Sequence, residues 1–304
     1  IPKGLHLLVD IDASPKLSFV NVMGSLIFAP DADPTHHRTF DAQYILVHGG
    51  YMEVGTEEFR YTSKITITMW STKYDPNLPI FGNKVIGVHY GQLEMHGIER
   101  PITWTELKTT AEAGATTITL NDMKNGAVLD WVVGEEIVIA STDFSGRNAE
   151  QRTIASISNT NSNPVITFTE PLEFKHYAGI QTFGDDFIEM RAEVGLLTRN
   201  VKYQGDPSSP IKQYGAVIIV HSPGDETSAA RIDSVELFNV GQAFILGSYP
   251  IHFHMIGTVH SSYIRNNAIH HTYNRAVTIH GIHYLRVQNN VAYHTMGHTI
   301  FIED

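Results

Sequence analysis

The side chains best suited to chemistry in this chain are histidines gathered near its end. Nine of the seventeen histidines fall between residues 249 and 304. His252 and His254 are one residue apart, His280 closes a short alternating run, and Glu303 closes the next such run. Imidazoles and a carboxylate held close together can bind a divalent metal, transfer protons near neutral pH, or form a hydrogen-bonded ladder. The elements that position these residues therefore decide what they do.

A repeat near the end of the chain indicates how they are positioned. The segment Asn266-Asn-Ala-Ile-His-His-Thr272 aligns with Asn289-Asn-Val-Ala-Tyr-His-Thr295 after a shift of 23 residues. Short strands with paired asparagines and a period near 23 are typical of one coil of a parallel β-helix, in which each coil stacks on its neighbours. Asn266, Asn267, Asn289 and Asn290 are expected to form ladders in the turns.

The same shift predicts a column of side chains on the outer face of the helix. Side chains alternate between the two faces of a strand, and neighbouring strands lie about 4.8 Å apart. His254, His280 and Glu303 should then stack vertically, with His252 beside them. The expected inward residues are Ile251, Phe253, Val277, Ile279, Ile300 and Ile302. The expected outward residues are His252, His254, Thr278, His280, Phe301 and Glu303.

Three uses of this column stay open at the level of sequence. His252, His254 and His280 could hold a divalent metal, calcium or zinc. His254, His280 and Glu303 could form an acid-base or sugar-binding site, in which the carboxylate should raise the pKa of the imidazoles. The column could also be a ladder without ligand. Arg275 and His298 form a second outward pair.

The rest of the chain reads as β-structure. Lys64-Ile-Thr-Ile-Thr-Met69 alternates strictly, and β-branched runs bounded by Gly, Pro, Asn or Asp recur along the sequence. We expect Ile65, Ile67 and Met69 on one face and Thr66 and Thr68 on the other. Residues before about 181 are predicted to form antiparallel or mixed sheet packed beside the helix.

Composition excludes several classes of protein. Apolar residues make up 42% of the chain and charged residues 17%, as in a folded globular protein. The net charge of −11 disfavours nucleic acid as a partner. No apolar run is long enough to span a bilayer, so membrane attachment is expected only through segments outside this chain. The pattern stops midway through a repeat, which indicates a fragment.

Several segments together resemble a known family. In order along the chain they are Ile1-Pro-Lys-Gly-Leu-His-Leu-Leu-Val-Asp10, Gly24-Ser-Leu-Ile-Phe28, Tyr44-Ile-Leu-Val-His-Gly-Gly50, Glu53-Val-Gly-Thr-Glu-Glu-Phe59, Asp130-Trp-Val-Val-Gly-Glu-Glu-Ile-Val-Ile-Ala-Ser-Thr142, Met190-Arg-Ala-Glu-Val-Gly-Leu-Leu-Thr-Arg-Asn200 and Tyr249-Pro-Ile-His-Phe-His254. The chain resembles the fibrocystin-type and transmembrane hyaluronidase-type proteins, over nearly its whole length.

The resemblance implies an all-β fold in which a β-sandwich-like eight-glycine domain packs on a right-handed parallel β-helix. The boundaries expected are 1–115 for the eight-glycine domain, 116–180 for a β-rich connecting domain, and 181–304 for the first coils of the helix. The resemblance also implies an extracellular, cell-surface or ciliary location.

For function, the resemblance favours a non-catalytic module of a large ectodomain that contacts carbohydrate or protein. Its partner would be a polysaccharide such as hyaluronan, or another ectodomain. One alternative is a hyaluronidase-like glycosidase or lyase that uses His254, His280 and Glu303, with Arg275 for a substrate carboxylate. The acidic Gly-Asp-x-Asp-type segment of the hyaluronan-degrading branch is absent, which argues against this alternative. The other alternative is a stiff structural element of an extracellular fibre, in which the chain would form oligomers or filaments.

Overall fold

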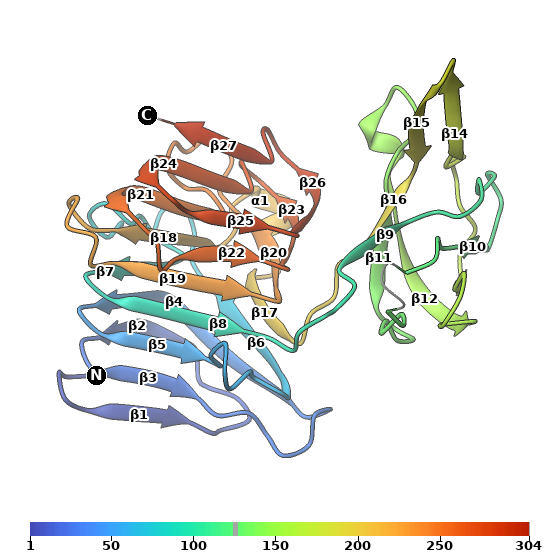
Figure 1. The fold of residues 1–304 in the computed structure, drawn as a ribbon. Helices are drawn as coiled ribbons and strands as arrows, with labels where there is room; N and C mark the ends of the chain where they lie inside the picture. Colours follow the sequence, from blue (N-terminus) through green and yellow to red (C-terminus); the bar gives the residue numbers. More distant parts are fainter. Residues whose placement is uncertain (124–126, 304) are drawn as a thin grey trace. The chain divides into compact units, whose positions relative to one another are not determined.

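The chain folds into two compact units whose regular secondary structure is almost wholly β-strand. The computed structural model describes residues 1–123 and 127–303 (Figure 1). One unit combines residues 1–99 with 199–304, and the other comprises residues 100–198. An all-β chain with parallel sheets confirms the predicted fold class.

The first unit is a single parallel β-helix with three faces (Figure 1). The first face contains β6 (Lys64–Met69), β17 (Val201–Gly205), β20 (Val235–Val240), β23 (Ala268–Thr272) and β26 (Val291–Thr295). The second contains β7 (Val85–His89), β18 (Val217–His221), β21 (Ile251–Thr258), β24 (Val277–His283) and β27 (Ile300–Glu303). The third contains β1 (His6–Val9), β3 (Ser25–Phe28), β5 (Tyr51–Val54), β8 (Gln92–His96), β19 (Ala229–Asp233), β22 (Tyr263–Arg265) and β25 (Arg286–Gln288).

A long strand joins the first two faces in the early coils. The first half of β4 (His37–His48) pairs with β6 and its second half pairs with β7. On its other side β4 pairs with β2 (Leu17–Val22). One short helix, α1 (Ser209–Lys212), lies between β17 and β18.

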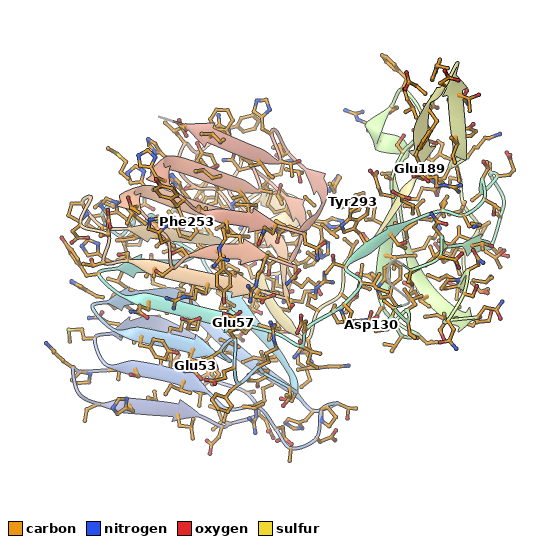
Figure 2. The ribbon with its side chains drawn as sticks, viewed as in Figure 1. Glu53, Glu57, Asp130, Glu189, Phe253 and Tyr293 are labelled. Atoms are coloured by element: carbon orange, nitrogen blue, oxygen red, sulfur yellow. The ribbon has the colours of Figure 1, made fainter. Side chains whose placement is uncertain are left out.

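The core of this unit lies inside the coils, and the predicted alternation is confirmed there. Ile65, Ile67 and Met69 belong to the core, whereas Thr66 and Thr68 point outward from it. Phe253 is fully buried inside the stack (Figure 2), and Ile279 packs partly buried against the same core. Ile302 continues this register but is 73% exposed, because no strand of the described chain pairs with the outer edge of β27. Ile300 is exposed for the same reason.

Residues 1–99 differ from the expectation of antiparallel or mixed sheet. Every strand pair among them is parallel, and these strands are the first coils of the β-helix rather than a sandwich packed on it. Glycines at the corners permit the close stacking of these coils. Gly24, Gly50 and Gly91 precede the three stacked strands β3, β5 and β8. A Cβ on Gly50 would lie 2.3 Å from the carbonyl oxygen of Val22, so successive coils approach too closely for any side chain.

The second unit is antiparallel, as predicted for the middle of the chain. Its six-stranded sheet contains β9 (Trp104–Glu106), β10 (Thr117–Thr119), β11 (Glu136–Ile139), β12 (Glu150–Ser158), β13 (Val165–Phe168) and β16 (Glu193–Leu196). A 3-10 turn, η2 (Gly146–Asn148), precedes β12, and a hairpin is formed by β14 (Ala178–Phe183) and β15 (Asp186–Arg191). The unit has its own apolar core.

The structure therefore divides the chain differently from the boundaries expected at 115 and 180. The chain leaves the β-helix after β8 and returns to it at β17, so residues 100–198 form an insertion between two coils. β6 lies beside β17, and β8 lies beside β19. The coils before and after the insertion consequently belong to one continuous stack.

Candidate functional site

The outer side of the second face carries a column of histidines that is longer than predicted. Glu303 lies in register with His280, which lies in register with His254. The same register continues through neighbouring strands to three histidines earlier in the chain, namely His221, His89 and His48. The stacking predicted for His254, His280 and Glu303 is confirmed, and the column starts in the first coils.

The sequence does contain a signal for the three additional histidines. Each follows a core valine at the end of a second-face strand, in Val47-His48, Val88-His89 and Val220-His221. Period-two alternation turns the valine inward and the histidine outward in every coil. The signal was missed because these coils do not repeat at 23 residues, and because the insertion separates β7 from β18.

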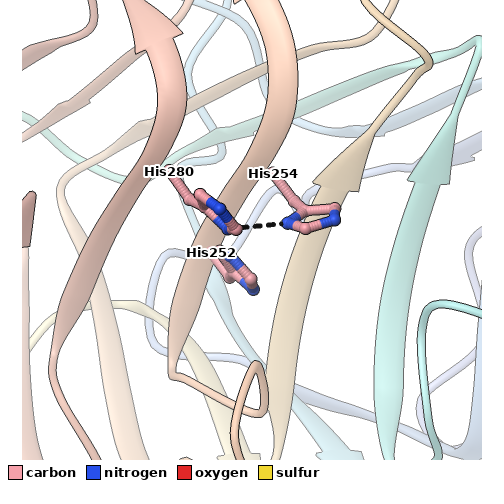
Figure 3. A group of neighbouring side chains, drawn as sticks. All are labelled: His252, His254 and His280. Atoms are coloured by element: carbon pink, nitrogen blue, oxygen red, sulfur yellow. Dashed lines mark hydrogen bonds between the residues drawn. The ribbon is translucent and has the colours of Figure 1, made fainter. Parts of the chain in front are cut away.

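His252 lies beside His254 and His280 of this column, and the three side chains converge (Figure 3). Each offers one ring nitrogen, and the three nitrogens lie within 4.8 Å of one another. The Nδ1 atoms of His254 and His280 are 2.9 Å apart and share a hydrogen bond. The rings of His252 and His280 stack almost parallel, with centroids 5.8 Å apart. The three residues predicted as metal ligands are thus brought together by β21 and β24.

His252 is fixed in the tautomer that a metal ligand requires. Its Nδ1 lies 2.8 Å from the carbonyl oxygen of Gly247, and only a protonated nitrogen can donate to that oxygen. In the neutral ring the lone pair is therefore on Nε2. The side chain is only 4% exposed, and Nε2 has no hydrogen-bond partner in the described part of the chain. Burial lowers the pKa of His252 to about 3, so the ring is neutral at physiological pH.

The pKa of His254 corrects the expected effect of the carboxylate. Burial is the largest cause and lowers this pKa, and the neighbouring His280 and His221 lower it further. Glu303 acts in the opposite direction but is the weakest of these influences. Desolvation outweighs the carboxylate, which leaves the ring of His254 neutral as well.

A pocket of about 420 Å³ opens over the three histidines. Its floor includes His252, His254, His280 and Glu303. One wall is the segment 80–82 and the other is the segment 245–249. The second wall also buries His252, through the Gly247 carbonyl and through Tyr249, whose ring centroid lies 5.0 Å from the imidazole. Sequence periodicity could not reveal these walls, because both belong to irregular loops between strands.

Arg275 contacts two residues that line the pocket, Tyr249 and Glu303. One of its guanidinium nitrogens, Nη1, lies 3.4 Å from the Glu303 carboxylate and donates to the Tyr249 hydroxyl at 3.0 Å. The guanidinium also stacks over Phe301, 3.6 Å from the ring centroid. The structure thus brings together all four residues of the predicted acid-base set. The guanidinium of Arg275 is paired with the Glu303 carboxylate, although the two were expected to act separately on a substrate.

The donor set suits a zinc-class ion better than calcium. Zinc binds imidazole nitrogens at about 2.0 to 2.1 Å, which puts ligand nitrogens roughly 3.3 Å apart in a tetrahedral site. Calcium instead takes six to eight oxygen ligands. Three imidazole nitrogens would leave the fourth position of a tetrahedral ion open toward the pocket.

Known families match both parts of the coil stack. Residues 1–108 match the G8 domain family, and residues 213–304 match the CEMIP beta-helix family. Over its full length the chain is 36% identical to Fibrocystin-L of Mus musculus. The chain is thus similar to Fibrocystin-L over its full length and combines a G8 domain segment with a CEMIP beta-helix segment. The match with Fibrocystin-L covers 100% of this chain and 8% of that much longer relative. The histidine column crosses both matched segments.

Two further comparisons cover most of the chain. A G8 domain-containing protein of Dictyostelium discoideum is 34% identical over 88% of this chain and 22% of its own length. The tailspike gp61 of Pseudomonas phage phi297 is 11% identical, with a TM-score of 0.28, over 86% of this chain and 42% of its own. The fibrocystin-L homology and the β-helix fold fit a module of an ectodomain. No helix in the described residues is long and apolar enough to cross a membrane.

Proposed function

We propose that this chain is a non-catalytic contact module of an extracellular, cell-surface or ciliary ectodomain, and that its contact site is a zinc-class metal ion held by His252, His254 and His280. The observation that carries the proposal is the unpartnered, buried Nε2 of His252, aimed into a pocket that two other imidazoles share. A buried polar atom without a partner is costly unless a ligand satisfies it.

The open side of the pocket supports a role in contact rather than a closed structural site. Structural zinc sites are usually surrounded by four protein ligands, whereas three ligands leave a position for an external group. The described part of the chain offers three histidine nitrogens here, and the pocket lies above them. A hydroxyl or carboxylate of a carbohydrate or of another protein could complete the coordination.

Thermal unfolding with and without zinc tests the metal site. A ligand that binds only the folded state at one hundred times its Kd stabilises that state by about 2.7 kcal/mol. We expect zinc to raise the melting temperature of the wild-type chain and to have no effect on His252→Ala or His280→Ala. His283→Ala is the matched control, because His283 is an exposed histidine of the same strand β24.

The result that overturns the metal proposal is an equal zinc response in all four proteins. Calcium at the same concentration provides a second comparison and should leave the melting temperature of every protein unchanged. A response to calcium alone would assign the site to a different ion.

An enzyme that cleaves polysaccharide is the second candidate, favoured by one observation. Three histidine ligands with an open fourth position, beside Glu303 and Arg275, are also what a catalytic zinc site requires. Incubating the zinc-loaded chain with hyaluronan and measuring polymer length separates the two candidates. The contact module leaves the length unchanged, and shortening that disappears in His280→Ala would establish the enzyme.

A further inference from the structure

The earlier part of the histidine column has a property that the metal site does not use. His89 donates from Nδ1 to the carbonyl oxygen of His221 at 3.1 Å, and His221 donates from Nδ1 to the carbonyl oxygen of His254 at 2.9 Å. A neutral imidazole that donates through Nδ1 carries its lone pair on Nε2. Both rings therefore present a hydrogen-bond acceptor that points away from the strand.

The Nε2 atoms of His89 and His221 have no hydrogen-bond partner among the residues that the structure describes. Both rings are only partly buried, so they remain accessible to a ligand. They stack with an interplanar angle of 4° and a centroid distance of 5.8 Å, and neither belongs to a group of three or more possible metal ligands among the described residues. The two nitrogens are thus suited to two separate hydroxyl donors.

Aromatic rings line the same strip. The ring of Phe81 meets His89 and His221 edge-on, with centroid distances of 5.8 and 6.4 Å. Tyr90 is 41% exposed and lies 4.2 Å from the His89 ring. Phe81 is also part of the pocket wall, so the strip is continuous with the pocket. Phe81 is only 5% exposed, so Tyr90 provides the accessible aromatic surface, and such a surface beside hydroxyl acceptors fits the apolar face and hydroxyl edge of a sugar ring.

The charge along the strip selects among sugars. The column contributes imidazoles and one carboxylate, Glu303, and Arg275 is already paired with that carboxylate. The chain as a whole has a net charge of −11. The negative net charge repels an anionic polysaccharide along the strip, and a zinc-class ion would offset this repulsion only at the pocket end, whereas an uncharged polysaccharide meets no such repulsion.

From this geometry we infer that an extended, uncharged glycan chain binds along the column, with its hydroxyl groups donating to Nε2 of His89 and His221 and one end reaching the histidine pocket. From β7 to β27 the strip spans roughly 20 Å at the usual strand spacing, enough for several sugar rings in a row. The inference rests on the proposed contact function and assigns its ligand class.

Calorimetric titration with two hexasaccharides of matched length tests this assignment. Cellohexaose is the uncharged probe and a hyaluronan hexasaccharide is the anionic one. We expect the wild-type chain to bind cellohexaose at least tenfold more tightly than the hyaluronan probe. The double variant His89→Phe with His221→Phe keeps ring volume but removes the acceptors, and should bind cellohexaose about tenfold more weakly.

Controls separate this inference from the metal proposal. His6→Ala removes an exposed histidine from β1 and should leave glycan binding unchanged. Far-UV circular dichroism checks that the double variant is folded. The zinc affinity of the single variant His89→Phe should equal that of wild type, because the His89 ring contacts His221 and not the three proposed metal ligands. If the double variant is unfolded, the single variant His89→Phe takes its place.

Three results overturn the glycan assignment while leaving the zinc site standing. In the first, wild type does not bind cellohexaose at millimolar concentration. In the second, wild type and the double variant bind cellohexaose equally. In the third, wild type binds the hyaluronan probe more tightly than cellohexaose. Loss of the zinc response with cellohexaose binding intact would instead reject the metal proposal and keep the glycan strip.

Discussion

A neutral, buried histidine makes a protein sensitive to acid, and His252 is such a residue. Its pKa in the folded chain is about 3, whereas an ordinary histidine titrates near 6.5. At pH values between about 3 and 6.5, His252 is protonated in the unfolded chain but neutral in the folded chain. The free energy of unfolding must therefore fall as pH decreases from about 6.5 toward about 3.

This linkage gives a measurable difference between two proteins. His252→Gln removes the titrating ring, so the stability advantage of wild type over the variant should shrink as pH falls from 7 to 4. A single ring contributes a slope of at most about 1.4 kcal/mol per pH unit. Urea unfolding of both proteins at several pH values, in the presence of a chelator, measures this difference in the free energy of unfolding.

Other buried histidines do not disturb this comparison. The pKa of His96 and that of His271 are each lowered to about 4 by burial, but both rings are present in wild type and variant alike. Their contributions cancel in the difference. A stability difference that stays constant from pH 7 to 4 would show that the pKa of His252 is the same in the folded and unfolded chains.

At the scale of residues, the sequence predicted which side chains meet but not their environment. Alternation and the shift of 23 placed His254, His280 and Glu303 in one column, because strand geometry alone determines that register. The burial of His252 depends on the loop around Gly247, which has no periodicity to read. The pKa direction at His254 was wrong for the same reason, since desolvation by the loops exceeds the influence of the carboxylate.

At the scale of elements, residues at the corners between strands determine how closely successive coils can stack. Gly50 lies where a Cβ would meet the carbonyl oxygens of Val22 at 2.3 Å and Gly24 at 2.6 Å. Gly50→Ala should lower the free energy of unfolding by about 1 to 3 kcal/mol, the usual cost of overpacking. Gly146→Ala, where a Cβ would meet nothing, is the control. Equal melting temperatures for the two variants would contradict the close approach of the coils.

The asparagine ladder makes a second prediction for the corners. Asn267 is fully buried, accepts from the backbone nitrogen of Val235 at 2.9 Å, and donates to the carbonyl oxygen of Ile232 at 3.0 Å. Its amide also reaches Asn290 in the next coil, as the repeat predicted. Asn267→Ala should cost about 2 to 4 kcal/mol of unfolding free energy, because a buried donor and a buried acceptor lose their partner.

Chemical denaturation compares this variant with a surface asparagine. Asn77→Ala alters an exposed loop residue and should leave the unfolding midpoint unchanged. A midpoint for Asn267→Ala that equals that of Asn77→Ala would mean that water replaces the ladder at no cost.

At the scale of the whole molecule, the insertion should be dispensable for the β-helix. The two apolar cores share no residue. The points of exit and return are adjacent, since the backbone nitrogen of Ile98 donates to the side chain of Asn200 at 2.7 Å. Replacing residues 100–198 by a short glycine-serine linker should leave a chain that unfolds in one cooperative transition and still responds to zinc. Aggregation or loss of the zinc response would show that the coils need the inserted unit.

The continuity of the coils was the part of the fold that sequence could not predict. The strands before and after the insertion are individually recognisable, but their parallel pairing joins residues more than one hundred positions apart. Alternation within a strand determines which face is buried and says nothing about which strand lies next to it. The expected boundary near residue 181 followed the repeat, which is visible only in the last coils.

The insertion also determines the order in which the coils can form during synthesis. After β6, β7 and β8 leave the ribosome, their stacking partners β17, β18 and β19 follow only once the inserted unit has been made. At 5 to 20 residues per second, about one hundred residues take roughly 5 to 20 seconds. For that interval the nascent coils present open strand edges, which favour pairing with other chains. Early folding of residues 100–198 would not shorten the time for which these strand edges are open. The need for chaperones during translation should therefore increase with the length of the insertion.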